Sequence, residues 1–423
     1  MNNVILLLGC LILFVITYYL NQGRVLNPSV LITAGFCLSS FIFCLSYKTW
    51  QYEISDKTIT YILCSLLFFC FGTRFGKRIK LEYKEGCNQS LNFGFSINRT
   101  GFIIICFIEM IYIILRAYSI ISTVGSLSLS TGVLGEYRTF SGTIRFDFPL
   151  KILAAIVGII GAFTSMLLID AIVGKKEKKY YLITLILYFI SNLLSSARIE
   201  AIYVFIYLFA AYFLVQNSEN KTGISIKTIV IVCLAGFVLI RLFLSMGYLT
   251  GKTQIQTSAA DNIYIYGGSS IGALDVYISS FDYDSSNFFT LCGKGIFTLL
   301  SYFGIKIGKT VSDGGGFILY GNMTHTTNIY TGLMYILHDF GYVGSMFVVF
   351  LQGCIYQIFY RKATKNLKSG RIAWTVFYIY ITPYILLTSI TDRFFTQQLT
   401  ITTIVVIVSL RLIMHATRAV IKE

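Results

Sequence analysis

The stretch 149–173, PLKILAAIVGIIGAFTSMLLIDAIV, decides the fold class of this chain. Its only charged side chains are Lys151 and Asp170, and most of the remainder is apolar. About 20 apolar residues in a helix are enough to cross the hydrocarbon core of a bilayer. We therefore expect a membrane-spanning helix here, because a helix satisfies its backbone polar groups within itself.

Ten further apolar runs lie on either side of this one. They fall near residues 3–20, 28–46, 58–75, 100–122, 180–194, 199–216, 228–246, 341–360, 372–389 and 396–414. Charged residues make up 13% of the chain, against roughly 25% in a soluble domain. The sequence thus predicts an all-α polytopic integral membrane protein of about eleven transmembrane helices. The first run has no basic leader and no small-residue cleavage site, so we expect it to be retained as a helix.

Basic residues give the spans a direction. Of the 34 Lys and Arg residues, 21 lie in one set of alternate loops. These loops cover residue 24 and residues 74–99, 175–179, 221–227, 361–371 and 411–422. Cytoplasmic loops carry an excess of Lys and Arg, so the N-terminus is predicted to lie outside and the C-terminus inside. This pattern also accounts for the net charge of +15 without nucleic-acid binding.

Two outer loops stand out, near residues 123–148 and 247–327. Loops as long as the second are usually functional. In residues 328–340 the apolar positions recur at helical spacing, which predicts an amphipathic helix at the outer membrane surface. We expect three regions: 1–246 with eight spans, 247–340 with the large loop and this helix, and 341–423 with three spans and a short tail.

The sequence lacks the common motifs of soluble enzymes. GxGxxG, GKS/T, HExxH and GxSxG are absent, which argues against nucleotide enzymes, zinc proteases and serine hydrolases. The ten Cys include no CxxC pair, so neither a metal site nor a disulfide framework is predicted. The spaced Asp residues of the large loop do not fit a calcium-binding loop. We therefore expect no metal and no cofactor.

Three arginines at outer ends of spans are candidate pyrophosphate ligands. Arg198 follows a short Leu-Leu-Ser-Ser-Ala turn and begins a helix, where a cation is unfavourable unless an anion joins it. Arg241 lies at membrane depth between apolar neighbours, and Arg393 lies in a short outer turn beside Asp392. Guanidinium groups bind phosphate oxygens bidentately and stay charged at all working pH values.

Each arginine also has a plainer interpretation. In the plainer interpretation, the Arg198 side chain extends to the membrane surface and binds no ligand. Arg241 is explained by an ion pair with Glu109 or Glu200 inside the membrane. Arg393 is explained by a surface pair with its neighbour Asp392.

Acid–base candidates on the predicted outer side are Glu136, His325, His338 and Asp339. Asp339 has the alternative role of capping the following span, and a lone loop histidine such as His325 is usually only solvated. Glu136 is also placed to pair with Arg138, two residues further along the chain.

Two further groups of side chains complete the candidates. Glu109 and Arg116 are seven residues apart in one span and are expected to face a cavity together. Aromatic rings of the large loop, including Tyr264 and Tyr266, are candidates for stacking on sugars.

Two stretches resemble a known family signature. THTTNIYTG covers residues 324–332 and HDFGYVG covers residues 338–344. Asn-x-Tyr/Phe-Thr, followed after about ten residues by Asp-Phe-Gly-x-x-Gly, is similar to the pattern of O-antigen polymerases, the oligosaccharide repeat-unit polymerases. The Ser-Ser-Ala-Arg turn at Arg198 looks like that family's arginine after a short outer loop. The layout of many spans, with a large outer loop before the last three, resembles the family over the whole chain.

The resemblance implies a location, a fold and substrates. Such enzymes lie in the bacterial inner membrane and act on its periplasmic side, in lipopolysaccharide biosynthesis. They transfer a growing glycan from undecaprenyl pyrophosphate to a new lipid-linked repeat unit, alongside a chain-length regulator. Their fold is similar to that of the metal-independent, membrane-embedded (GT-C-like) glycosyltransferases.

On this basis the candidate residues take roles. Arg198, Arg241 and Arg393 are expected to hold the donor pyrophosphate, and Asp339, His325 or Glu136 to act as the base. Asn328 and Tyr330, from the motif, join Tyr264 and Tyr266 as expected sugar contacts.

Two other functions stay open. O-antigen ligases share this architecture and carry a loop histidine near the place of His325, and they transfer the finished polymer to lipid A–core. A flippase for lipid-linked oligosaccharides is the third candidate, although the chain shows none of the internal repeats typical of transporters.

Overall fold

The structure is a computed structural model of the 423-residue chain. It describes residues 1–80, 97–125, 133, 137, 147–174, 178–194, 198–218, 241, 259–302, 304–305, 318–320, 325–327, 329–368, 372–398 and 400–417. Within these residues six helices are long and apolar enough to cross a membrane, and four shorter apolar helices accompany them. These helices coincide with ten of the eleven predicted spans, so the chain is a multi-pass, all-helical membrane protein. The remaining predicted span, 228–246, lies outside the described residues except for Arg241.

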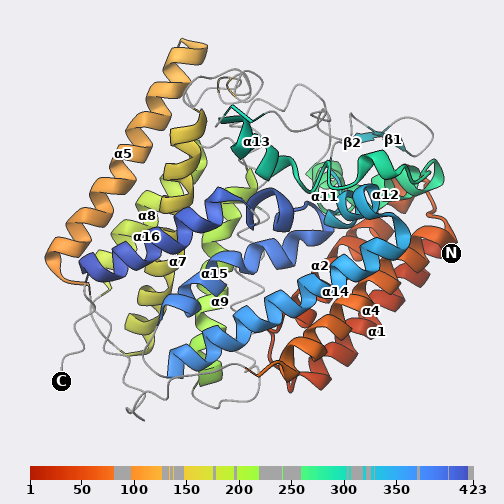
Figure 1. Ribbon diagram of the computed structural model, residues 1–423, viewed down its shortest axis with the longest axis horizontal. Helices are drawn as coiled ribbons and strands as arrows, with labels where there is room; N and C mark the ends of the chain where they lie inside the picture. Colours follow the sequence, from red (N-terminus) through yellow and green to blue (C-terminus); the bar gives the residue numbers. More distant parts are fainter. Residues whose placement is uncertain are drawn as a thin grey trace. The chain divides into compact units, whose positions relative to one another are not determined.

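The chain divides into two compact units (Figure 1). Unit 1 comprises residues 1–84, 258–361 and 384–403, and unit 2 comprises residues 85–257, 362–383 and 404–423. Both units are therefore assembled from segments far apart in the sequence. The three sequential regions expected from membrane topology divide the chain in another way, and they stay a prediction.

The long helices of unit 1 are α1 (Asn2–Leu20), α2 (Pro28–Leu45), α4 (Asp56–Arg78) and most of α14 (Gly332–Lys368). In Figure 1, α1, α2 and α4 form a group at one side of unit 1 with α14 running beside it. Local signals set where these helices begin. Asn27 accepts the Ser29 N–H just before α2, with Pro28 at its first position, and Ser55 caps α4.

Shorter elements of unit 1 lie between the long helices in the sequence. They are α3 (Tyr47–Trp50), α11 (Ala259–Gly267), α12 (Ser269–Ser279), the 3₁₀ turn η3 (Ser285–Asn287), α13 (Lys294–Tyr302), β1 (Ile318–Tyr320), β2 (His325–Thr327), the 3₁₀ turn η4 (Leu387–Ser389) and the π-helix η5 (Phe394–Gln398). The strands pair antiparallel, with Ile318 opposite Thr327 and Tyr320 opposite His325.

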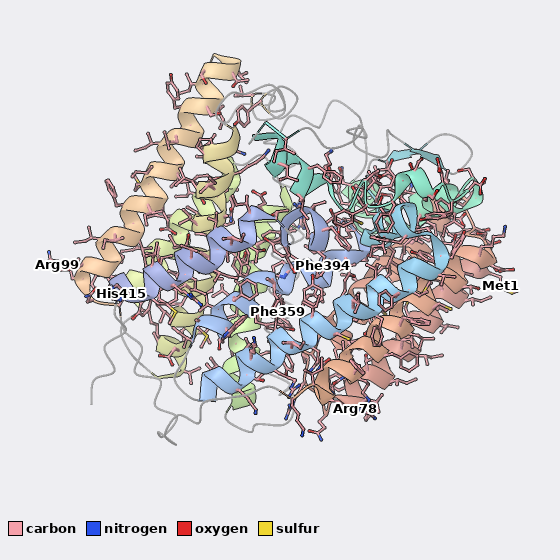
Figure 2. All side chains as sticks on the ribbon, viewed as in Figure 1. Met1, Arg78, Arg99, Phe359, Phe394 and His415 are labelled. Carbon is pink, nitrogen blue, oxygen red and sulfur yellow. The ribbon has the colours of Figure 1, made fainter. Side chains whose placement is uncertain are left out.

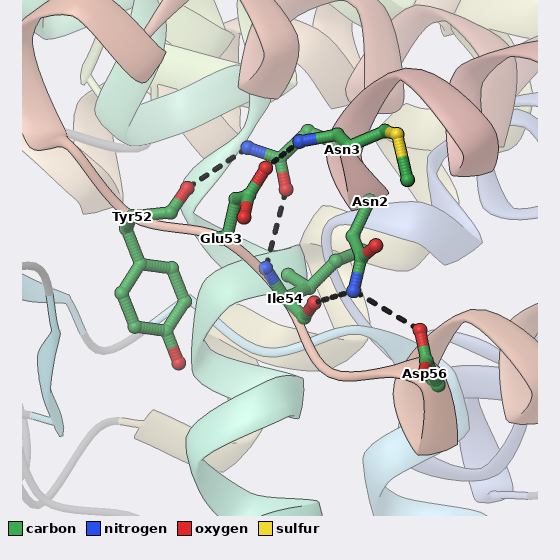
Figure 3. A network of polar contacts seen from close by, with 7 residues as sticks. Asn2, Asn3, Tyr52, Glu53, Ile54 and Asp56 are labelled. Carbon is green, nitrogen blue, oxygen red and sulfur yellow. Dashed lines mark hydrogen bonds and ion pairs between the residues drawn. The ribbon is translucent and has the colours of Figure 1, made fainter.

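Polar contacts tie the start of α1 to the loop before α4 (Figure 3). The Asn2 side-chain amide donates to the Ile54 carbonyl (2.9 Å) and to the Asp56 carboxylate (3.0 Å). Asn3 donates to the Tyr52 carbonyl (2.8 Å) and accepts the Ile54 N–H (3.2 Å). These bonds hold the beginnings of α1 and α4 side by side.

Asp275 of α12 joins the large loop to the same end of unit 1. Its buried carboxylate accepts the Tyr52 hydroxyl (2.6 Å), the Ser55 N–H (2.8 Å) and the Ser55 hydroxyl (2.7 Å). Since α12 belongs to the predicted outer loop, the loop packs on the end of unit 1 where the chain begins.

The opposite end of unit 1 is basic. Met1 and Arg78, both labelled in Figure 2, mark the two ends. At the basic end Lys77 donates to Asn21 (2.6 Å), and Arg361 donates to the Gly76 and Ile79 carbonyls (2.8 and 2.7 Å). The basic residues and the large loop thus lie at opposite ends of unit 1, and the orientation of these ends across the membrane stays a prediction.

Unit 2 consists of apolar helices with a few enclosed polar groups. Its helices are α5 (Arg99–Val124), α7 (Asp147–Val173), α8 (Lys179–Leu194), α9 (Arg198–Ser218) and most of α15 (Ala373–Leu386) and α16 (Ile401–Thr417). Asn98 caps α5 by accepting the Gly101 N–H (2.7 Å). Small residues allow close packing, as at Gly161, which lies against the Tyr188 ring.

Candidate functional site

Helix α14 contains a break at Gly341, inside the Asp-Phe-Gly motif. Gly341 has φ 63° and ψ −175°, a conformation that a residue with a Cβ rarely adopts. Residues 332–340 therefore form a helix of their own, set off from the long apolar segment that follows. The predicted separate helix is present, beginning at Gly332.

This short helix is packed within unit 1, and its predicted position at the outer membrane surface stays a prediction. Leu333, Ile336, Leu337 and Asp339 are all at most 1% exposed. Other parts of unit 1 also pack on this helix. The Phe289 ring of the loop 288–292 lies 6.3 Å from the Phe340 ring, and the Phe395 ring of η5 is tilted against Phe340 with centroids 6.4 Å apart.

Asp339 holds the loop against this helix. One carboxylate oxygen accepts the Leu291 N–H (3.0 Å) and the Thr290 hydroxyl (3.2 Å), and the other accepts the Cys292 N–H (2.7 Å). The side chain is 0% exposed. Asp339 thus caps backbone amides of the loop before it, rather than those of the following span.

His338, the neighbour of Asp339, pairs with Tyr277 of α12. The Tyr277 hydroxyl oxygen lies 2.7 Å from His338 Nδ1. Burial, together with the negative charge of Asp339, raises the pKa of Tyr277 to about 12, so this phenol stays protonated at neutral pH. The second nitrogen of the half-buried imidazole, Nε2, is buried and has no hydrogen-bond partner among the described residues.

Asp392 is not the surface partner of Arg393 that the sequence suggested. It is 4% exposed, and its carboxylate accepts the N–H groups of Phe395 (3.4 Å) and Thr396 (3.0 Å) at the start of η5. Burial raises the pKa of Asp392 to about 6, in spite of these hydrogen bonds and the nearby guanidinium. Arg393 itself is partly exposed in the same turn.

The other two arginines belong to unit 2. Arg198 begins α9, as the capping argument predicted, but its side chain lies outside the described residues. Arg241 is exposed rather than enclosed by protein. The three predicted pyrophosphate ligands are thus divided between the units, with Arg393 in unit 1.

The structure describes only some of the remaining predicted site residues. Tyr264 of α11 packs edge-on against Trp50 (6.1 Å), and Tyr266 is partly exposed. Tyr330 is 5% exposed, so it contributes more to packing than to an open surface. Asn328, Glu136 and the side chain of His325 lie outside the described residues, although the His325 backbone is in β2.

An apolar groove of about 960 Å³ runs between α4 and the part of α14 that follows Gly341. We call it the α4–α14 groove. Its walls include Cys64 and Phe68 from α4 and Met346 and Phe347 from α14, and one end also has polar residues. That end lies on the loop-bearing side, because it includes Ser279, the last residue of α12.

Sequence reasoning missed three features of this site. The first is the bond between Tyr277, an aromatic residue of the large loop, and His338, which joins residues 61 positions apart. Asp275 and the α4–α14 groove also depend on contacts between distant segments. The His338-Asp339 pair beside a helix-breaking glycine was the one local signal available.

No family model, curated protein or solved structure matches this chain. Among the described residues no three His, Cys, Asp or Glu side chains gather as a possible metal site.

Proposed function

We propose that this protein is a glycosyltransferase that joins oligosaccharide repeat units carried on undecaprenyl pyrophosphate, as an O-antigen polymerase of the GT-C-like type. The reaction would take place at the periplasmic face of a bacterial inner membrane. The observation that carries the proposal is the Tyr277–His338 pair, at the loop-bearing end of unit 1. In a half-buried imidazole, one nitrogen bound to Tyr277 and the other without a hydrogen-bond partner among the described residues are suited to general acid–base chemistry.

The proposed reaction is one displacement. A hydroxyl of the acceptor sugar attacks the anomeric carbon of the donor, and a new carbon–oxygen bond forms. The bond from that carbon to the pyrophosphate oxygen breaks, and lipid pyrophosphate leaves with the bonding electrons. His338 accepts the hydroxyl proton at Nε2 while its Nδ1–H donates to the Tyr277 oxygen. This tautomer places the imidazole lone pair on Nε2 rather than on Nδ1.

Other residues take supporting roles in the proposal. Arg393, in the turn before η5 of unit 1, neutralises the departing pyrophosphate. Asp339 positions the loop 290–292 beside the base, since hydrogen bonds from that loop already occupy both its oxygens. This shifts the expected base from Asp339 to its neighbour His338.

The test is chain extension by purified protein in lipid nanodiscs. The protein receives only lipid-pyrophosphate repeat units, and products are separated by length. A ladder of longer glycans is expected from the unaltered protein and a strongly reduced one from His338→Asn. The matched control is His415→Asn, which makes the same change at an exposed histidine of α16. An unchanged ladder from His338→Asn would remove this residue as the base.

The same assay separates polymerase from ligase. A ligase needs lipid A–core as its acceptor, so it leaves lipid-linked repeat units unextended when they are supplied alone. If glycan transfer occurs only after lipid A–core is added, the ligase assignment replaces the polymerase.

One observation in unit 2 favours the flippase as a second candidate. Glu109 of α5 is 0% exposed, and its carboxylate has no hydrogen-bond partner among the described residues. Carboxylates inside the membrane often serve as proton sites of transporters. Movement of fluorescent lipid-linked sugar across vesicles that contain the protein, with loss in Glu109→Gln, would establish this activity.

A further inference from the structure

The shape of the α4–α14 groove follows from where its two helices touch. At one end of the contact Gly72 faces the Phe350 carbonyl and Gly353 faces the Phe69 carbonyl, so closely that a Cβ at either glycine would collide with that oxygen. Gly72 and Gly76 form a Gly-x-x-x-Gly pattern, which lets membrane helices approach closely. Towards the other end bulky side chains separate the helices, and the groove opens there.

Tyr61 keeps the open end of the groove in place. Its hydroxyl donates to the Leu333 carbonyl (3.0 Å), and its ring meets Tyr342 edge-on (5.7 Å). Between the ring contacts and the glycine contact the walls are apolar, and Val343 and Phe347 are 88% and 62% exposed. A groove with apolar walls and exposed rims on membrane helices faces hydrocarbon.

The open end carries one available cation. Asp56 and Lys57 both line it, and Asp56 already accepts a hydrogen bond from Asn2. Lys57 is exposed and, among the described residues, makes no ion pair. An apolar channel that ends at a lysine complements an amphiphile with one long hydrocarbon chain and an anionic head.

The same end is continuous with the proposed catalytic pair. Ile278 and Ser279, which line the groove, directly follow Tyr277 on α12. Tyr342, also in the lining, comes four residues after His338 and packs edge-on against Phe281 (5.7 Å). The lining of the groove that includes Lys57 therefore adjoins Tyr277 along α12 and comes within four residues of His338 along the chain.

We infer that the α4–α14 groove holds the polyprenyl chain of the donor substrate, with Lys57 contacting its pyrophosphate. The inference rests on the proposed function for the identity of the lipid. We assign the groove to the donor because the donor's reacting bond lies next to its pyrophosphate. The lipid chain of the donor must therefore bind within one headgroup's length of the catalytic base. The acceptor hydroxyl is instead separated from its own pyrophosphate by the sugars of a repeat unit.

Binding is tested without the reaction. A polyprenyl pyrophosphate probe that carries a photoreactive diazirine on its chain, and no sugar, is crosslinked to the protein in nanodiscs. Labelled peptides are then identified by mass spectrometry. Labelling is expected on residues 56–78 and 342–353, and a tenfold excess of unlabelled polyprenyl pyrophosphate should suppress it. Labelling that this excess of unlabelled polyprenyl pyrophosphate leaves unchanged would overturn the assignment.

Substitutions test the groove itself. Cys64→Trp fills the groove and should abolish labelling, whereas Cys64→Ala at the same position should preserve it. Ile12→Trp introduces the same residue on the exposed face of α1 and serves as a second control. Full labelling of Cys64→Trp, in protein shown to be folded by its melting profile, would overturn the inference.

Lys57 provides an independent test. In Lys57→Gln the KM for the lipid-linked donor should rise about tenfold with little change in kcat, the effect of losing about one charge-assisted hydrogen bond. Lys48→Gln, at an exposed lysine of α3, is the matched control. An unchanged KM in Lys57→Gln overturns the headgroup contact.

The outcomes separate the groove from the proposed function. If the groove is labelled but no glycan is extended, the lipid site stands and the polymerase proposal fails. If Cys64→Trp extends glycans normally, the groove inference fails and the polymerase proposal stands.

Discussion

The hydroxyl oxygen of Tyr277 lies 2.7 Å from Nδ1 of His338, and these two residues come from segments 61 positions apart. The contact joins α12 of the large loop to the short helix before Gly341. Neither side chain alone indicates a function. Together they form a pair in which the contact at Nδ1 orients the imidazole ring. A second group that orients the ring is a common requirement for a catalytic histidine.

The first prediction concerns this pair. His338→Asn should lower kcat for chain extension by about 100-fold or more, since a positioned general base contributes roughly 10²–10⁴. Tyr277→Phe should lower it by only about three- to tenfold, because it removes one orienting hydrogen bond. Rates are measured under saturating substrate. Equal effects of the two changes would argue that the pair is merely structural.

The second prediction separates Asp339 from its neighbour. In Asp339→Asn one carboxylate oxygen is replaced by an NH2 group, which cannot accept the backbone N–H that this oxygen accepted. The change should therefore reduce the free energy of unfolding by about 1–3 kcal/mol. Thermal unfolding in detergent measures this loss. Asp282→Asn, at an exposed position of the same loop, should leave the melting temperature unchanged. A stable Asp339→Asn protein without activity would restore Asp339 as a candidate base.

The third prediction is a pH dependence that arises at Asp392. Its pKa is about 6 in the folded protein against 3.8 for the free side chain. The folded state therefore binds this proton more tightly than the unfolded state does. The resulting stabilisation is complete below about pH 4 and is lost as the pH rises through 6.

The measurement compares unfolding of the unaltered protein and Asp392→Asn between pH 4 and 7. Asn preserves an N-cap acceptor but cannot titrate. The difference in stability between the two proteins should change by about 3 kcal/mol over this range, since each pKa unit corresponds to about 1.4 kcal/mol. A difference that stays constant with pH would show that Asp392 does not titrate in this way.

The fourth prediction contrasts two buried carboxyl groups. Asp275 accepts three hydrogen bonds, whereas Glu109 has no hydrogen-bond partner among the described residues. Asp275→Leu should therefore destabilise the protein by about 3 kcal/mol or more, because it leaves buried donors unsatisfied. Glu109→Leu should leave the stability unchanged or raise it, since it removes an unsatisfied polar group.

Melting curves of the two variants in the same detergent test this contrast. A destabilising Glu109→Leu would indicate that Glu109 has a structural partner. Loss of transport without loss of stability would instead favour the flippase alternative.

Much of the fold could be predicted because hydropathy is a local property. Each apolar run, such as 149–173, is long enough to cross a membrane irrespective of what surrounds it. The helix break at Gly341 was likewise signalled locally, within the Asp-Phe-Gly motif. The location of the short helix at the outer membrane surface stays a prediction, and its packing against other segments of unit 1 could not be read from its periodic pattern.

The candidate site was less accessible to sequence reasoning. A carboxylate in an outer loop has the same local sequence whether it serves as a base or anchors backbone amides. Asp339 and Asp392 both proved to be anchors, and this depends on which N–H groups the fold brings to them. The roles proposed for the His325 and Arg198 side chains stay predictions, because these side chains lie outside the described residues.

The sequence by itself determined a many-span helical membrane protein with a large loop, because burial of apolar runs in lipid requires no particular neighbour. Only the tertiary structure decided that Tyr277 meets His338, that Asp275 joins the loop to the start of α4, and that a groove opens above the glycine contact of α4 and α14. Each of these depends on side chains from distant segments, and their meeting is set by the packing of the whole of unit 1.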